Sequence, residues 1–141
     1  MLGFQIAFDA TGDPEFPEKA AFEEARPLGL RVTTPAGVWG ATDDRSIKLM
    51  ADHGFMTDDV TYVHASTLSE DSYQRIAASG AYATESEQNA GQGYPTSWQL
   101  RRHRIPVSLS TDTSVWWSAD MFSAMGATSA RTAAASTSRL T

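Results

Sequence analysis

Short apolar runs alternate with amphipathic stretches along most of the chain, and this alternation predicts the fold. Each run has the length of a buried strand, and each following stretch repeats its apolar residues at helical spacing. The predicted strands begin near residues 4, 30, 60, 81 and 106. Strand–helix units of roughly 25 residues imply right-handed crossovers and a parallel sheet. The fold class is therefore α/β, and the pattern alone fits both an open doubly wound sheet and five of the eight units of a TIM-type barrel.

The predicted helices have recognisable ends. The first starts at Pro17 and should end at Pro27, because proline inside a helix removes a hydrogen bond. Another starts at the capping residue Ser69 and ends at Gly80. Further helices are expected at 43–53, 95–103 and 119–130. Residues 132–141 are mainly Ala, Ser and Thr, so we expect a disordered tail after one domain of residues 1–131.

Polar side chains stand where the predicted strands end. Asp9, His64, Glu85 and Asp112 each follow or close an apolar run. In a parallel sheet these ends share one edge, where a strand fixes a residue and the next loop leaves it open to solvent. The segment 105–114 is the most suggestive one, with a short buried strand that leads to Asp112. Asp112 either belongs to a site at this edge or caps a turn.

Composition narrows the function classes. At 141 residues the chain is one domain or part of a larger protein, well short of the ~250 residues of a full barrel. A net charge of −6 argues against a nucleic-acid partner, which requires a basic face. Without cysteine, any metal must be held by His and carboxylates. The sequence shows no signal-peptide pattern and no long apolar run, which predicts a cytoplasmic protein with no membrane partner.

Three separated motifs resemble the second half of the amidohydrolase superfamily. They are residues 62–69 (YVHASTLS), 91–95 (GQGYP) and 105–112 (IPVSLSTD), the last followed by 120–122 (DMF). The most similar branch is that of cytosine deaminase and the chlorohydrolases. The resemblance covers residues 2 to about 130, with the motifs in the family's order and spacing. It implies that the five strands are the fourth to eighth of a metal-dependent barrel.

The resemblance also implies roles for individual residues. Asp112 stands at the position of an acid that ligates the metal and moves a proton of the metal-bound water. His64 matches a histidine that orients the substrate or ligates a metal. The family's histidine at the end of strand five corresponds to Pro35, which has no donor atom, and its acid/base glutamate would align with Val38. The His-x-His pair of strand one lies outside this sequence.

These departures leave two hypotheses. In the first, the chain is a truncated amidohydrolase that acts on C–N or C–Cl bonds of a small heterocyclic substrate with zinc or iron. In the second, it is a catalytically silent fragment that associates with itself or with a partner, because open strand edges favour association and homo-oligomers. A catalytic zinc requires about three protein ligands, whereas His64 and Asp112 supply at most two. We therefore expect no tightly bound metal and no activity from the isolated chain.

The other candidate residues have structural alternatives. Trp116 and Trp117 are predicted to wall a substrate pocket, but one of them could equally pack in the core. Glu85 is a candidate for substrate binding, and the alternative is a solvated loop. For His103 we expect favourable electrostatics at a helix C-terminus rather than catalysis.

Overall fold

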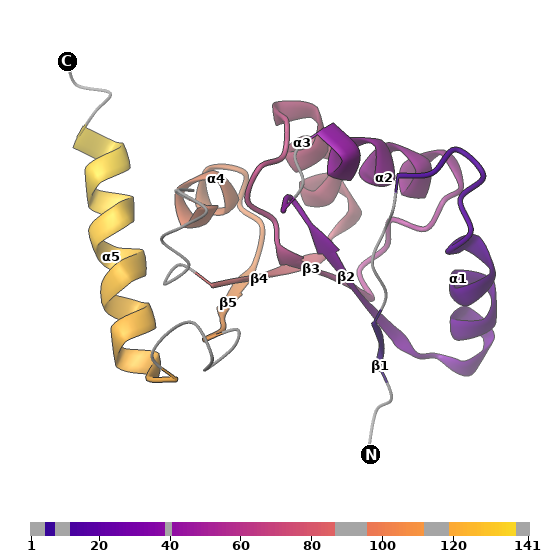
Figure 1. The fold of residues 1–141 in the computed structure, drawn as a ribbon, viewed down its shortest axis with the longest axis horizontal. Helices are drawn as coiled ribbons and strands as arrows, with labels where there is room; N and C mark the ends of the chain where they lie inside the picture. Colours follow the sequence, from indigo (N-terminus) through magenta and orange to yellow (C-terminus); the bar gives the residue numbers. More distant parts are fainter. Residues whose placement is uncertain (1–4, 8–11, 39–40, 87–95, 112–118, 138–141) are drawn as a thin grey trace.

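A parallel sheet of five strands runs through the described residues (Figure 1). The computed structural model describes residues 5–7, 12–38, 41–86, 96–111 and 119–137. The strands are β1 (Gln5–Ala7), β2 (Arg31–Ala36), β3 (Val60–His64), β4 (Tyr82–Glu85) and β5 (Val107–Leu109). They lie in the sheet in chain order, and each pairs in parallel with the next. The prediction of a parallel sheet is confirmed.

The strand order also decides between the two folds that the sequence left open. A doubly wound sheet reverses its strand order at a switch point, whereas a barrel wall adds each strand beside the previous one. The order β1-β2-β3-β4-β5 has no reversal. The described part of the chain is thus five consecutive units of a barrel wall.

Helices connect the strands and cover the sheet. They are α1 (Lys19–Ala25) with the short 3-10 turn η1 (Arg26–Leu28), α2 (Ala41–Asp52), α3 (Glu70–Ser79), α4 (Thr96–Arg102) and α5 (Met121–Thr137). Figure 1 shows α2, α3 and α4 on the same side of the sheet. Helix α1 gives way to η1 next to Pro27, as predicted. None of the helices in the described segments is long and apolar enough to span a membrane.

The core lies between one side of the sheet and these helices. Burial alternates along β2 and β4, so that every second side chain is enclosed. The largest fully buried side chains include Tyr62 from the sheet and Phe22, Met50, Tyr73 and Leu100 from the helices. Full burial of an aliphatic or aromatic side chain stabilises a fold by about 1.5–3 kcal/mol. The side chains between them, such as Thr33, Pro35 and Val63, are only half-buried and point to the other side of the sheet.

The end of the chain differs from the prediction. Helix α5 continues to Thr137, past the expected end near residue 130, and so includes residues 132–137 of the segment predicted as a tail. Residues 138–141 lie outside the described segments. The prediction considered burial alone, whereas a run such as 133–135 (AAA) has the highest intrinsic helix propensity.

Candidate functional site

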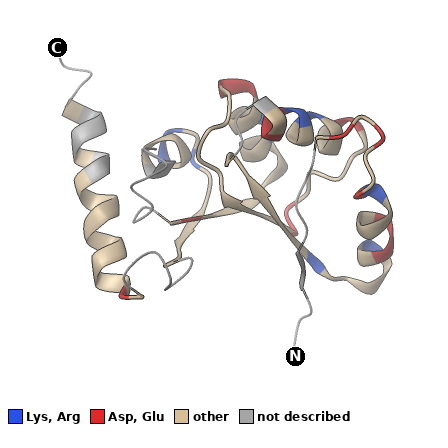
Figure 2. Cartoon of the chain, in the orientation of Figure 1, with Lys and Arg blue, Asp and Glu red and all other residues tan. Residues whose placement is uncertain are grey.

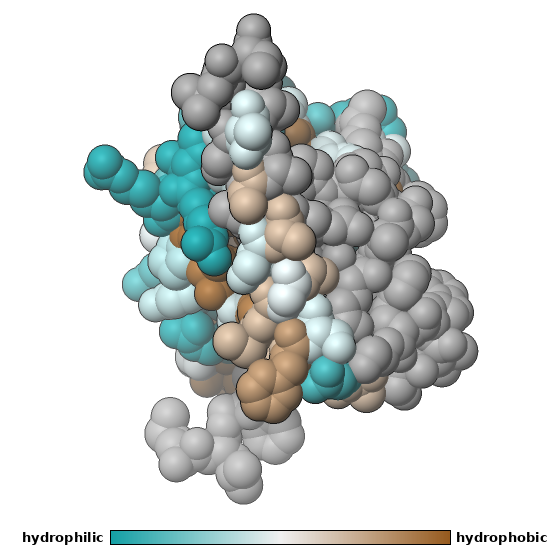
Figure 3. Space-filling model, turned by 90° about the vertical axis from the view of Figure 1, so that its left-hand side faces the viewer, coloured by the Kyte–Doolittle hydropathy of each residue, from teal (hydrophilic) through white to brown (hydrophobic). Residues whose placement is uncertain are grey.

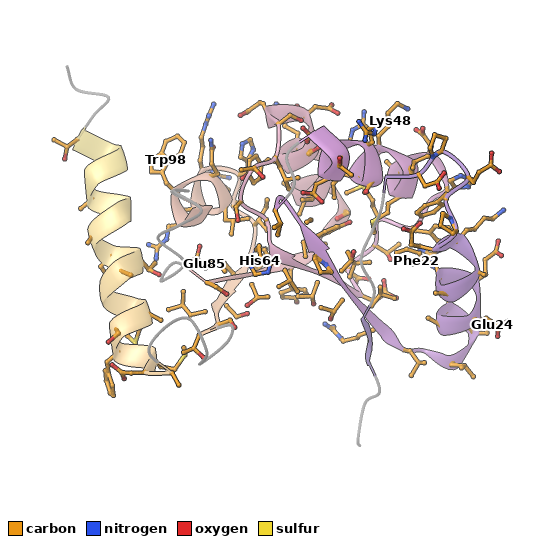
Figure 4. The ribbon with its side chains drawn as sticks, viewed as in Figure 1. Phe22, Glu24, Lys48, His64, Glu85 and Trp98 are labelled. Atoms are coloured by element: carbon orange, nitrogen blue, oxygen red, sulfur yellow. The ribbon has the colours of Figure 1, made fainter. Side chains whose placement is uncertain are left out.

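The best-defined candidate site is the C-terminal end of β3, the middle strand of the sheet. His64 is the last residue of this strand and pairs with Ala36 at the end of β2. Val63 pairs with Thr84 on the other side, so β4 ends beside it at Glu85. His64 is half-buried, and Figure 4 shows it at the middle of the sheet. This is the edge at which (β/α) enzymes place their chemistry.

The backbone at His64 is strained. His64 has φ +70° and Ala65 has φ +46°, a region that residues with a Cβ rarely adopt. The Ala65 amide donates a hydrogen bond of 3.0 Å to the Val63 carbonyl, which closes a three-residue turn around His64. Such conformations cost about 1–3 kcal/mol each and persist only where the surroundings enforce them. The turn directs the imidazole away from the regular course of the strand.

Gly37 is one of the residues that enforce this turn. Its carbonyl accepts a 2.8 Å hydrogen bond from the Thr67 amide and a second one from the Thr67 hydroxyl. A Cβ added to Gly37, which has φ +79°, would lie 2.4 Å from the Ser66 amide nitrogen. Only glycine therefore allows the exits of β2 and β3 to approach this closely.

Side chains of helices α2 and α3 hold the loop after β3 in place. The Asp44 carboxylate accepts hydrogen bonds from the Ser69 amide (2.9 Å) and the Ser72 hydroxyl (2.6 Å). The Ser69 side chain caps α3 in turn by accepting a 3.3 Å bond from the Ser72 amide. The Tyr73 hydroxyl lies 2.8 Å from the carbonyl oxygens of both Ala65 and Ser66. Burial raises the pKa of Tyr73, so the hydroxyl keeps its proton and donates.

The side of the sheet away from the core forms an uncharged wall near His64. Pro35 and Val63 pair across β2 and β3, and Thr84 follows on β4. These side chains offer a hydroxyl group and apolar surface but no formal charge. Pro35 thus lies on the strand adjacent to His64 and supplies no metal donor, as the sequence indicated. The arrangement suits a neutral ligand with hydrogen-bonding groups rather than an ion.

Several predicted site residues lie outside the described segments. They are Asp9, Asp112, Trp116 and Trp117. Beyond the end of β5, the Ser110 amide donates a 2.8 Å hydrogen bond to the Glu85 carbonyl, so residue 110 lies beside the end of β4. The approach of Asp112 to His64, and the pocket wall formed by the two tryptophans, stay predictions.

Glu85 has a different setting from the solvated loop that was one interpretation of the sequence. It is the last residue of β4 and is 1% exposed, so that interpretation is wrong. One carboxylate oxygen lies 3.5 Å from the Thr128 hydroxyl of α5. Figure 4 shows Glu85 on the α5 side of His64. Its role in substrate binding stays a prediction.

Zinc or iron, the metals that the resemblance implies, can be tested against the donors present. Within the described segments, no group of three or more His, Asp or Glu residues could hold a metal ion. His64 is the one predicted ligand placed there, and the neighbouring Pro35 has no donor atom. The described residues alone do not fit a resident catalytic metal, which requires about three protein ligands.

Sequence reasoning missed three residues that build the site. Gly37 carried a local signal, because glycine just after a strand often marks a close approach of backbones. Asp44 lies at the start of the predicted helix 43–53, and Tyr73 lies within the helix predicted from Ser69 to Gly80. Their hydrogen bonds to the loop after β3 depend on the tertiary fold and leave no pattern in the sequence.

Comparison with known proteins supports the fold. No protein-family model and no curated protein matches the sequence. An adenosine deaminase from Xanthomonas campestris with bound zinc matches 96% of this chain at a TM-score of 0.73 and 21% identity. An atrazine chlorohydrolase from Arthrobacter aurescens TC1 in complex with zinc matches 69% of it at 0.57 and 18%. A triazine hydrolase from Arthobacter aurescens matches 74% at 0.57 and 18%.

The chain covers only part of each of these proteins. It spans 33% of the adenosine deaminase, 26% of the triazine hydrolase and 23% of the atrazine chlorohydrolase. At these identities the likeness concerns the fold. The fold of this chain is therefore similar to part of the fold of a deaminase and of two hydrolases, as its resemblance to the amidohydrolase superfamily implied.

Proposed function

We propose that this chain supplies the His64 part of an amidohydrolase-type active site, which hydrolyses a C–N bond, or a C–Cl bond, of a small heterocycle. The observation that carries the proposal is the strained turn at His64, at the C-terminal end of the middle strand. Strain of this kind gathers at functional sites, where it aims a side chain. The likeness of the fold to a deaminase and two hydrolases supports the reaction type.

Each residue has a distinct role in this proposal. The His64 imidazole holds and orients the substrate through a hydrogen bond to a carbonyl oxygen or ring nitrogen. The wall of Pro35, Val63 and Thr84 carries no charge and suits a neutral ring. Asp112 is the acid that takes and returns a proton during hydrolysis, and Trp116 and Trp117 contact the ring. The role of Asp112 rests on the resemblance, and that of the two tryptophans rests on their place after a predicted strand.

The isolated chain should be inactive, because its predicted ligands, His64 and Asp112, are fewer than the about three protein ligands that a catalytic zinc requires. Removing one member of a catalytic unit often lowers the rate nearly as much as removing all of them. We therefore expect no tightly bound zinc or iron, and no turnover of pyrimidine or triazine substrates above background. Elemental analysis and a deamination or dechlorination assay with added zinc test both points. Turnover by the unmodified chain that is lost in Asp112→Ala would show that it is an enzyme on its own.

Complementation tests the positive part of the proposal. The first three βα units of a related deaminase are added to the Pro35→His variant with zinc, which restores the missing donors and closes the barrel. We expect turnover that falls at least about 100-fold in His64→Ala. His53→Ala is the matched control, because His53 stacks on Phe16 away from the strand ends. Equal turnover in both histidine variants would contradict a role for His64.

A catalytically silent, associating module is the second candidate. The observation in its favour is that β1 and β5 are the ends of the described sheet and each pairs with one strand only. Free strand edges can pair with another copy of the chain. Sedimentation equilibrium distinguishes the two candidate functions, because a silent, associating module should form concentration-dependent homo-oligomers of the isolated chain. A monomer at all concentrations would exclude self-association.

A further inference from the structure

Tyr73 connects the buried core to the loop that follows His64. Its side chain rises from α3, is 1% exposed, and ends 2.8 Å from the carbonyl oxygens of Ala65 and Ser66. These two carbonyls belong to the peptide units directly after the strained turn. The buried Tyr73 hydroxyl therefore contacts both carbonyl groups. The orientation of these two peptide units determines the path of the backbone after His64.

The orientation of these carbonyls fixes the turn itself. A peptide unit is planar, so a hydrogen bond to the Ala65 carbonyl restricts ψ of Ala65, and a bond to the Ser66 carbonyl restricts the next unit. Without such contacts, His64 and Ala65 would relax toward negative φ, which is the lower-energy region for residues with a Cβ. That relaxation would turn the imidazole away from its present direction.

The Tyr73 ring is held in place by a neighbouring helix. The His103 ring, at the end of α4, stacks on it with a centroid distance of 5.4 Å and an interplanar angle of 12°. The Nε2 atom of His103 lies 3.3 Å from a carboxylate oxygen of Glu70, at the start of α3. The Arg102 guanidinium lies 3.3 Å from the other oxygen of that carboxylate. Contacts between α3 and α4 thus hold the His103 ring against the Tyr73 ring.

We propose that Tyr73 is a positioning residue that holds His64 in its strained turn. It acts through the backbone and does not contact the substrate. The proposal about geometry stands on the hydrogen bonds alone, and its consequence for binding rests on the function proposed for His64. No local sequence feature assigns this role, because the hydroxyl and the turn meet only in the folded chain.

Tyr62 provides a matched control within the same core. It is also fully buried, and burial raises its pKa as well, so both hydroxyls stay protonated. Among the described residues the Tyr62 hydroxyl has no hydrogen-bond partner. Tyr73→Phe and Tyr62→Phe therefore remove the same atom from equally buried rings, but only the first removes a contact to the loop after His64.

Nuclear magnetic resonance of the full chain tests the geometry. In Tyr73→Phe we expect shifted imidazole signals of His64 and roughly five- to tenfold faster amide exchange at Ala65 and Thr67. Tyr62→Phe should change neither. Unaltered His64 signals in Tyr73→Phe, or equal changes in both variants, would overturn the proposal. So would a uniform loss of protection over the whole chain, which indicates lower global stability alone.

A measurement on the unmodified chain tests the proposal even if Tyr73→Phe fails to fold. The Tyr73 hydroxyl proton should be protected from solvent exchange and lie close to the Ser66 and Thr67 backbone, as nuclear Overhauser effects report. A Tyr73 hydroxyl proton without contacts to this loop would contradict the proposal whatever the variant does.

Turnover then separates geometry from function. In the complemented Pro35→His protein with zinc, Tyr73→Phe should lower turnover about tenfold, as for residues that orient a functional side chain, and Tyr62→Phe should not. If the His64 signals shift as expected but His64→Ala leaves turnover unchanged, the positioning role holds and the function proposed for His64 is wrong. If both tyrosine variants turn over the substrate equally, Tyr73 does not position His64 for the substrate.

Discussion

Helices α3 and α5 pack against the sheet in very different ways. Helix α3 buries Tyr73 and Ile76, and its N-terminus is capped by Ser69. Helix α5 is longer, yet Ala124 and Thr128 are its buried residues among those whose side chains are described. Its larger apolar side chains are exposed, namely Met121, Phe122 and Met125. Figure 3, which faces this side of the molecule, shows apolar atoms at the surface.

The distribution of charged residues differs between the same two regions. Figure 2 shows charged residues spread over α1 to α4, whereas residues 121–130 of α5 include no charged residue. On α3, the pair of Arg75 and Asp71 at 2.7 Å is one of the solvent-facing contacts. The comparison shows that the exit of β3 is built by hydrogen bonds from α2 and α3, whereas α5 contributes little to the chain's own core.

Loss of core packing should give the largest difference between the helices. Ile76 is fully buried in α3, and Ile76→Ala leaves a cavity that costs about 2–5 kcal/mol of unfolding free energy. Phe122 is 83% exposed, so Phe122→Ala should change this free energy by no more than about 0.5 kcal/mol. Urea denaturation measures both. A loss above about 2 kcal/mol in Phe122→Ala would mean that α5 is part of the cooperative core.

Gly37→Ala should disrupt the exit of β3 almost as strongly. The added Cβ meets the Ser66 amide nitrogen at 2.4 Å and also strains the backbone, for about 2–4 kcal/mol in total. Gly29→Ala is the control, since Gly29 has a similar φ of +63° but nothing within 4 Å of the added atom. It should cost only about 1–2 kcal/mol. Equal losses in thermal or urea unfolding would show that strain alone explains Gly37.

Asp44→Ala should have a smaller effect on the same loop. It removes the acceptor of the Ser69 amide and the Ser72 hydroxyl, a loss comparable to that of a helix cap at about 1–2 kcal/mol. Asp71→Ala is the control, because its exposed pair with Arg75 should contribute little to stability. Hydrogen exchange at Ser69 and Ser72 locates the change. Unaltered exchange there would contradict the link between α2 and α3.

The sequence was informative wherever structure depends on local pattern. Strands β2 and β3 are nearly continuous apolar or β-branched runs, and the capping of α3 by Ser69 is visible in the letters alone. His64 could be placed at the sheet edge for the same reason. Contacts between distant segments left no such signal. Asp44 and Ser69, or Tyr73 and Ala65, meet only through the fold, and the burial of Glu85 depends on α5.

Acid should affect the start of α5 before it affects the buried part of α3, and this is the smallest effect we expect. Asp120 accepts hydrogen bonds from the Ser123 hydroxyl and from the Phe122 and Ser123 amides, and these bonds lower the pKa of its carboxyl. Because the pKa is lower in the folded state, this contribution is present above the unfolded value of about 3.9 and is lost as the pH falls through the folded value.

The first turn of α5 should therefore fray as the pH falls below about 4, while the Cα chemical shifts around Ile76, in the buried part of α3, change little. Asp120→Asn keeps an acceptor at the cap but cannot titrate, so its α5 should show no such pH dependence. If the start of α5 frays with acid in both proteins, another group controls it. If the helix around Ile76 unfolds at the same pH, the two helices are equally coupled to the core and the contrast between them fails.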